Sequence, residues 1–141
     1  MTFNTPGQPG LGELDTLVSR YVDVDGIPWI DLPFPGVQGK ILLTDDTGVR
    51  TALARMAPGS EIPYHEHTGL EQTFMLEGSL EDDDGECSAG QYVWRLDGNR
   101  HTARSPKGCL MLVNFESPNV YLSGEMKGMT MEEFIAKKAA A

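Results

Sequence analysis

The chain has 141 residues, of which 40% are hydrophobic and 23% are charged, a balance that is typical of a globular domain and unlike that of a disordered chain. Its net charge of −10 disfavours nucleic acid and anionic membrane surfaces as partners, because both repel a polyanion. We therefore expect a single domain over residues 1–141 that binds neither nucleic acid nor membrane.

The amino-terminal third is predicted to hold irregular segments and short edge strands. Residues 1–12 are rich in glycine, proline and polar side chains, which is typical of a flexible arm. Residues 14–24 combine apolar side chains at helical spacing with β-branched ones, so their structure stays open. Proline interrupts residues 26–37, which favours edge strands because proline donates no hydrogen bond to a central ladder. The core barrel is expected over about residues 29–122.

Regular strands are predicted from residue 40 onward, separated by turns that contain Asp, Gly or Pro. The expected strands are 40–44, 49–56, one that carries the first two histidines, 71–80, 91–96, 101–104 and 110–115. The acidic run 81–84 lacks the spacing of a calcium loop and is expected to be a solvated turn. Thr130 is predicted to cap a helix over 131–137, with acids in its first turn and lysines in its last. Short strands at this spacing indicate an all-β sandwich or barrel.

The two cysteines, Cys87 and Cys109, are isolated in the sequence and form no CxxC pair. The amino terminus has no basic region followed by an apolar run, so no secretory signal is expected. No stretch of about 18 apolar residues could cross a membrane. We therefore expect two free thiols in a cytoplasmic protein.

All three histidines of the chain fall into one pattern of potential metal ligands. The pattern is Gly59-x5-His65-x-His67-x3-Glu71-x6-Gly78, followed by Gly90-x10-His101. Residues two apart in a strand share a face, so His65 and His67 are expected to project together. Three imidazoles and a carboxylate suit a divalent transition metal. The predicted ligands are therefore His65, His67, Glu71 and His101.

This pattern resembles the cupin superfamily, whose first motif, G-x5-H-x-H-x3-E-x6-G, is met at every fixed position. The second motif is met at Gly90, Gly98 and His101, with Leu96 in place of its proline and Ser105 in place of its asparagine. The resemblance implies a double-stranded β-helix, a jelly-roll barrel of antiparallel strands that is commonly dimeric.

Over about residues 29–122 the chain resembles one subgroup, the ChrR-like cupins, more closely. The matching features are Glu71-Gln72, Leu76-Glu77-Gly78, the turn Asp82-Asp83-Asp84-Gly85 and the Cys87-x2-Gly90 spacing. That subgroup contains acetylacetone-cleaving dioxygenases and the carboxy-terminal domain of a zinc-dependent anti-sigma factor. Residues 1–30 contain no histidine or cysteine, so the zinc-binding helical domain of that anti-sigma factor is not expected here.

The resemblance implies an Fe(II) dioxygenase that cleaves a β-dicarbonyl substrate with O2, its catalysis centred on the metal. The diketone-cleaving members use three histidines alone, whereas Glu71 is also available here. A fourth protein ligand resembles the anti-sigma factor domain, so a binding or sensory module without catalysis stays open, as does non-oxidative metal chemistry. Zinc or nickel could occupy such a site in isolated protein, because affinities follow the Irving–Williams order.

Two further expectations concern surfaces. A substrate pocket over the metal is predicted to be lined by Tyr64, Thr73, Met75, Trp94 and Arg55, although the apolar members could equally be core or interface residues. Arg55, Arg95 and Arg104 could bind an acidic substrate or lie at the surface. A homodimer is expected, in which the apolar segment that contains Trp29, Ile30, Phe34 and Val37 covers the sheet of the partner.

Overall fold

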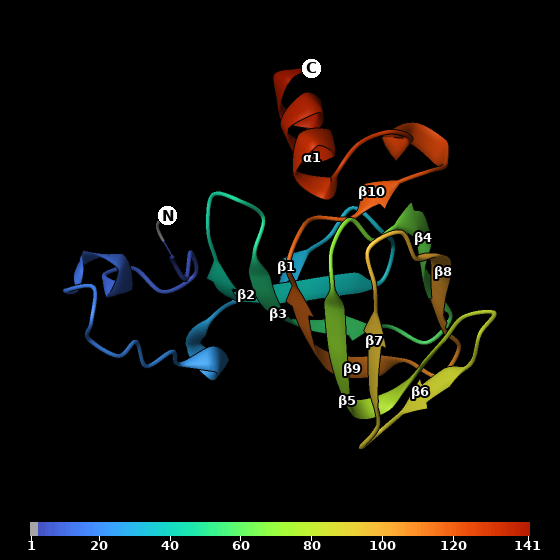
Figure 1. Ribbon diagram of the computed structural model, residues 1–141, viewed down its shortest axis with the longest axis horizontal. Helices are drawn as coiled ribbons and strands as arrows, with labels where there is room; N and C mark the ends of the chain where they lie inside the picture. The colour runs from blue at the N-terminus through green and yellow to red at the C-terminus, as the bar shows by residue number, and fades with distance from the viewer. Residues whose placement is uncertain (1–2) are drawn as a thin grey trace.

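The computed structural model describes residues 3–141, whose backbone forms a curled antiparallel β-sheet that closes into a barrel (Figure 1). The strand order is β1-β2-β3-β9-β5-β8-β4-β10, and β6 and β7 each pair with β5. The strands are β1 (Ile30–Asp31), β2 (Val37–Thr44), β3 (Arg50–Met56), β4 (Ser60–Glu66), β5 (Glu71–Glu81), β6 (Glu86–Ser88), β7 (Tyr92–Arg95), β8 (Arg100–Ser105), β9 (Cys109–Phe115) and β10 (Val120–Tyr121). The prediction of an all-β jelly-roll barrel is confirmed.

Turn chemistry explains how the strands succeed one another. Between β2 and β3, one carboxylate oxygen of Asp45 accepts hydrogen bonds from the backbone N–H groups of Thr47, Gly48 and Val49. Gly48 has a φ of 104°, a conformation that costs glycine little and other residues much. The turn expected between the predicted strands 40–44 and 49–56 is therefore present, and it fixes the register of β2 against β3.

The hydrophobic core lies inside the barrel. Alternate residues of the strands point inward, so Val37 of β2, Met75 of β5 and Val113 of β9 are buried together with Met56 and Met111. Both cysteines are buried and free, as expected.

The carboxy-terminal helix α1 (Met131–Ala140) follows β10 and stands over one end of the barrel (Figure 1). The hydroxyl oxygen of Thr130 accepts from the backbone N–H of Glu133, and the Glu133 carboxylate accepts from the backbone N–H of Thr130. This capping box confirms the predicted start of the helix. Met131 and Phe134 anchor α1 to the core, and no helix in the described chain is long and apolar enough to span a membrane.

The segment before β2 is mostly irregular. Residues 14–24 form neither an α-helix nor a strand; short 3-10 turns occur at η1 (Leu11–Glu13) and η2 (Val24–Gly26), and a third, η3 (Gly124–Met126), follows β10. Part of the expected 1–12 arm is tied to the sheet, since Asn4 exchanges backbone hydrogen bonds with Thr44 and the Thr5 hydroxyl donates to the Leu42 carbonyl. Met1 and Thr2 lie outside the described residues.

Candidate metal centre

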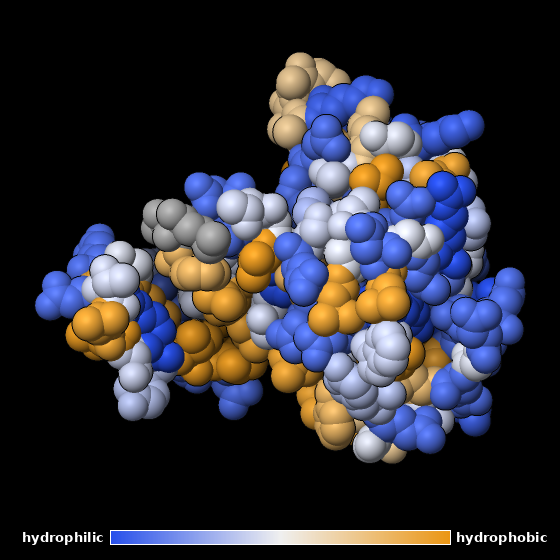
Figure 2. Space-filling view, viewed as in Figure 1, coloured by the Kyte–Doolittle hydropathy of each residue, from blue (hydrophilic) through white to orange (hydrophobic). Residues whose placement is uncertain are grey.

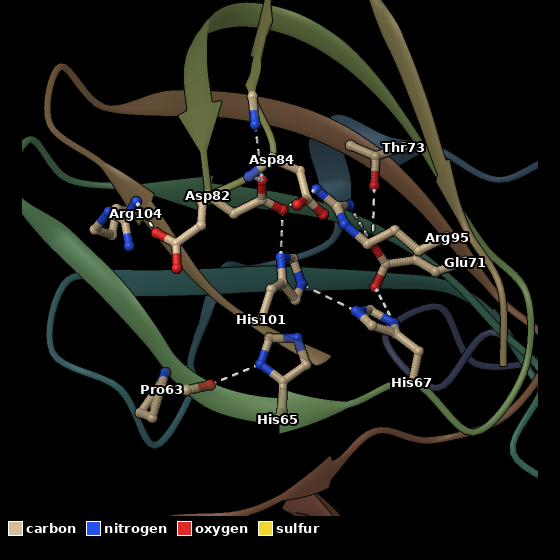
Figure 3. Close-up of polar contacts among 12 residues, drawn as sticks. Pro63, His65, His67, Glu71, Thr73, Asp82, Asp84, Arg95, His101 and Arg104 are labelled. Atoms are coloured by element: carbon tan, nitrogen blue, oxygen red, sulfur yellow. Dashed lines mark hydrogen bonds and ion pairs between the residues drawn. The ribbon is translucent and has the colours of Figure 1, made fainter. Parts of the chain in front are cut away.

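Two neighbouring strands and the loop between β7 and β8 bring the three histidines together. His65 on β4 pairs directly with His101 on β8. His67 lies just beyond the end of β4, where its N–H donates to the Asn99 carbonyl at 2.8 Å and its own carbonyl accepts from the Gly98 N–H at 2.7 Å. The three side chains are buried and converge inside the barrel (Figure 3).

The Nε2 atoms face the centre of the cluster, and the Nδ1 atoms face outward to oxygen atoms. His67 Nε2 lies 2.9 Å from His101 Nε2, and one potential ligand atom from each ring lies within 4.8 Å of the others. The Nδ1 of His65 lies 2.6 Å from the Pro63 carbonyl oxygen. Because a carbonyl oxygen only accepts, this Nδ1 carries the hydrogen and leaves the Nε2 lone pair of His65 free.

Electrostatics keeps these rings neutral. Burial lowers the pKa of His65 to about 4 and that of His67 to about 2, and burial together with the Arg95 charge lowers the pKa of His101. His101 donates through Nδ1 to Asp82, so its Nε2 carries a lone pair that can accept the one hydrogen of the neutral His67 ring from Nε2 at 2.9 Å. Binding of a divalent cation by all three Nε2 atoms needs that hydrogen on His67 Nδ1 instead, where the Glu71 carboxylate lies 3.2 Å away, so the residues fit the metal that the sequence pattern predicts.

Glu71, at the start of β5, is buried beside His67 rather than among the Nε2 atoms. Its Oε2 lies 3.2 Å from His67 Nδ1, while its Oε1 accepts from Arg95 at 3.2 Å and from the Thr73 hydroxyl at 3.3 Å. Burial raises the pKa of the Glu71 carboxyl, and the Arg95 charge opposes that shift. The contact with His67 Nδ1 lacks hydrogen-bond geometry, so Glu71 lies beside the ring as a charged neighbour, and a role as fourth ligand stays a prediction.

Two residues outside the predicted ligand set, Asp82 and Arg95, complete the cluster. Asp82 was expected in a solvated turn, yet its side chain is buried and its Oδ2 lies 2.8 Å from His101 Nδ1. Arg95 joins the two acids, with one guanidinium nitrogen 3.2 Å from Asp82 and another 3.2 Å from Glu71. Although burial disfavours the charged form of Asp82, its hydrogen bond with His101 lowers the pKa of the Asp82 carboxyl.

A cavity of about 370 Å³ extends from His65 and His101 through the barrel toward α1. At the end near the cluster, the cavity is lined by four polar residues, His65, His101, Glu71 and Thr73. Most of the other residues that line its interior are apolar. The apolar lining residues are Leu32, Phe34, Val37, Ile41, Ala52, Ala54, Ile62, Leu80, Ala103, Met111, Val113, Phe115, Tyr121 and Met131. Arg50 of β3 and Glu132 of α1 form an ion pair among the residues that line its far end.

Of the five predicted pocket residues, Thr73 alone lines this cavity. Met75 is fully buried in the core, while Tyr64 and Trp94 are exposed. Arg55 lies on the outer face of β3, with its guanidinium carbon 4.1 Å from the centre of the Trp29 ring and Nε donating to Gln38. Strand alternation explains these positions, because Trp94 shares its orientation with exposed Tyr92 whereas Arg95 points inward.

A comparison with family models matches the ChrR cupin-like domain over residues 18–118. No curated protein matches the sequence. Among solved structures, an acetylacetone dioxygenase from Acinetobacter johnsonii aligns with a TM-score of 0.73 and 20% identity, covering 90% of this chain and 95% of that one. A protein from Methylibium petroleiphilum, assigned provisionally to the same activity, aligns with a TM-score of 0.73 and 21% identity over 83% of this chain and 90% of that one.

The anti-sigma protein ChrR, solved in complex with SigE of Rhodobacter sphaeroides, is also similar. It aligns with a TM-score of 0.55 and 27% identity, over 62% of this chain and 48% of that one. The two dioxygenase structures support the fold, and the family model covers well over half of the sequence. The chain therefore belongs to the ChrR cupin-like domain family.

Proposed function

We propose that this protein is a dioxygenase for small β-dicarbonyl compounds, with Fe(II) held by His65, His67 and His101. The observation that carries the proposal is the position of the three-histidine cluster at the inner wall of an apolar cavity. A closed structural zinc site uses four protein ligands, whereas a site that serves chemistry keeps positions open. The nearby acids face Nδ1 atoms and Arg95, which supports a three-histidine site open toward the cavity.

The side chains around the cluster have separate tasks in this proposal. When bound, Fe(II) would supply the Lewis acidity that holds a β-dicarbonyl as its enolate and the redox partner that O2 needs. The Pro63 carbonyl and Asp82 would hold the rings of His65 and His101 so that their Nε2 lone pairs face the centre, while Glu71 would favour the metal through its charge beside His67. Apolar residues such as Phe34 and Val113 keep water away from the reacting carbon atoms.

Oxygen uptake tests the proposal. Metal-free protein is loaded with Fe(II) without oxygen, mixed with pentane-2,4-dione, and followed with an oxygen electrode. We expect uptake that is lost in His67→Ala together with iron binding. No uptake with any β-dicarbonyl in the iron-loaded protein would contradict the proposal.

Glu71→Gln tests the three-histidine ligand set, because glutamine keeps the size of the side chain and removes its charge. The variant is expected to bind iron and to retain oxygen uptake. The matched control is Glu66→Gln, which removes the same charge from a glutamate that pairs with Arg100 at the protein surface. If Glu71→Gln lost iron as completely as His67→Ala did, Glu71 would be a ligand and the three-histidine assignment would be wrong.

The second candidate is a metal-bound sensory or binding module, which the similarity to the anti-sigma protein ChrR favours. This candidate predicts that zinc raises the melting temperature while neither the zinc nor the iron form consumes oxygen. The same two measurements, applied to one preparation, therefore separate the candidates.

A further inference from the structure

The cavity beside the histidine cluster is larger than the smallest β-dicarbonyl compounds need. Its volume is about 370 Å³, which lies in the range of pockets that hold drug-sized ligands. Because a water-sized group occupies about 30 Å³, the cavity has room for roughly twelve such groups. Pentane-2,4-dione has seven non-hydrogen atoms, so it leaves room for about five more.

Small residues on two neighbouring strands create this room. Ala52 and Ala54 of β3 share the inward face of their strand, and Gly39 of β2 pairs with Ala54 in the register of the sheet. All three residues line the cavity. The interior of a small barrel is usually filled by larger side chains, and a cavity lowers the stability of a fold as its volume grows. A ligand that fills the space accounts for these small residues.

The walls of this space are mostly apolar away from the histidine cluster. Phe34 and Val37, which the sequence analysis placed against the sheet of a partner, are instead buried in their own barrel and line the cavity. Alternate residues of β2 face inward, and the Phe34 ring packs against Tyr121 with 5.2 Å between ring centres. Ile41 and Val113 continue the wall. An apolar substituent is favoured in this space, whereas a polar one would lose its hydration without gaining partners.

The far end of the cavity carries charges that are already paired. Among the described residues that line the cavity, Arg50 is the only lysine or arginine, and its guanidinium forms an ion pair with the Glu132 carboxylate of α1. Asp45 and Asp46, in the turn just before β3, also line this end. One positive and three negative side chains give a net charge of −2 there. A substrate that ended in a carboxylate would meet this negative charge and would have to displace Glu132 from Arg50.

Helix α1 covers this end of the cavity with its apolar side. Met131 lines the cavity, and Phe134 packs against the core. Figure 2 shows hydrophilic residues on the outer side of this helix, at the top of the view, together with the alanines of its end. The ion pair of Arg50 with Glu132 and the capping box at Thr130 hold the start of the helix in place. The helix therefore limits the length of a ligand that starts at the histidine cluster.

We infer that the substrate is a β-dicarbonyl compound with an uncharged, apolar substituent of about four to six carbon atoms on one side. The inference rests on the proposed function, because the histidine cluster then fixes the dicarbonyl end. The substituent occupies the apolar space beside Ala52 and Ala54 and ends beneath α1 at Met131. The enolate is the only charged group of such a substrate.

Three compounds with the same reacting group test this substrate class. They are pentane-2,4-dione, nonane-2,4-dione and 5,7-dioxooctanoate, whose chain has the length of the nonanedione chain and ends in a carboxylate. Each of the four added methylenes favours transfer from water by up to about fourfold, and ordering the chain opposes part of that gain. In iron-loaded protein, kcat/KM for oxygen uptake should therefore be about 20-fold or more higher with nonane-2,4-dione than with pentane-2,4-dione. The carboxylate compound should be no better than pentane-2,4-dione.

Binding is measured independently of turnover. Calorimetric titration of zinc-loaded protein with the same compounds should give the lowest dissociation constant for nonane-2,4-dione, again by about 20-fold or more relative to pentane-2,4-dione.

Ala52→Leu and Ala54→Leu test where the substituent lies, because each adds three carbon atoms to the space that it would occupy. In both variants the ratio of kcat/KM for nonane-2,4-dione to that for pentane-2,4-dione should fall about tenfold or more. The melting temperature of the metal-free variants should not fall, since a side chain that fills a cavity commonly stabilises a fold. The control Ala57→Leu adds the same atoms at an exposed position just beyond β3 and should keep the wild-type ratio.

Three results would overturn the inference. The first is a wild-type protein that binds and turns over pentane-2,4-dione as well as nonane-2,4-dione. The second is a preference for 5,7-dioxooctanoate, which would assign Arg50 to an anionic substituent. The third is an unchanged ratio in both leucine variants. Failure of the proposed function is a separate result, because the iron form would then consume no oxygen with any compound, and the zinc titration would still decide the class of ligand.

Discussion

Asp82→Asn isolates the contribution of the acid behind His101. The wild-type carboxylate lies 2.8 Å from His101 Nδ1 and 3.2 Å from Arg95, and its side chain is 7% exposed. Asparagine keeps an oxygen acceptor of the same size but removes the charge that fixes the ring and favours cation binding. Loss of such a partner typically weakens metal binding about 10–100-fold, which corresponds to about 1.4–2.8 kcal/mol. We expect a loss in this range, with the three histidines still able to bind.

Competition with a chromophoric chelator, using Zn²⁺ or Co²⁺ at pH 7.5, measures this affinity. The matched control is Asp83→Asn, because it removes the same charge from the same turn at a side chain that is 96% exposed and paired with Arg104 at the surface. Circular dichroism and the melting temperature of the metal-free protein separate loss of affinity from loss of fold. If Asp82→Asn and Asp83→Asn bound metal equally well, the contact with His101 would have no part in the site.

Two further predictions concern stability. Burial lowers the pKa of His65 to about 4, so as the pH falls below 6.5 the unfolded chain binds a proton at His65 before the folded chain does. Denaturant unfolding of the metal-free protein should therefore show about 2 kcal/mol less stability at pH 5 than at pH 7.5 from His65 alone. Equal stability at both pH values would contradict this. Gly78 has a φ of 72°, and an added Cβ would lie 2.0 Å from the Gly108 carbonyl oxygen. Gly78→Ala should therefore lower the free energy of unfolding by more than about 3 kcal/mol. The control Gly85→Ala, whose added Cβ meets nothing within 4 Å, should change it by less than about 1 kcal/mol in the same assay.

The strands and the three histidines were predictable because their signals are local. Turn residues between apolar runs, such as Asp45 and Gly48, mark where a strand must end. The spacing of His65 and His67 gives both rings access to the interior even though His67 lies beyond the strand. The capping box of Thr130 and Glu133 is equally local, and it marked the start of α1 to the residue.

Asp82 was missed because its position depends on the register of β5. Glu71, Thr73 and Met75 alternate inward, but an irregularity between Met75 and Glu77 shifts the pattern, so counting along the sequence gives no orientation for the end of the strand. Arg95 was within reach of the sequence. Its strand alternates exposed Tyr92 and Trp94 with Val93 and Arg95, and a strict reading of that period places Arg95 inside.

The charges of the buried cluster explain why these acids and Arg95 occur together. With both carboxylates ionised, Glu71, Asp82 and Arg95 sum to one negative charge around three neutral imidazoles. A divalent cation would change this sum to one positive charge, which is costly in an apolar interior. A singly charged chelating anion, such as the enolate of a β-dicarbonyl, would bring it to neutrality, whereas a neutral ligand would leave the charge uncompensated. The composition of the cluster thus favours a monoanionic ligand, in agreement with the proposed substrate class.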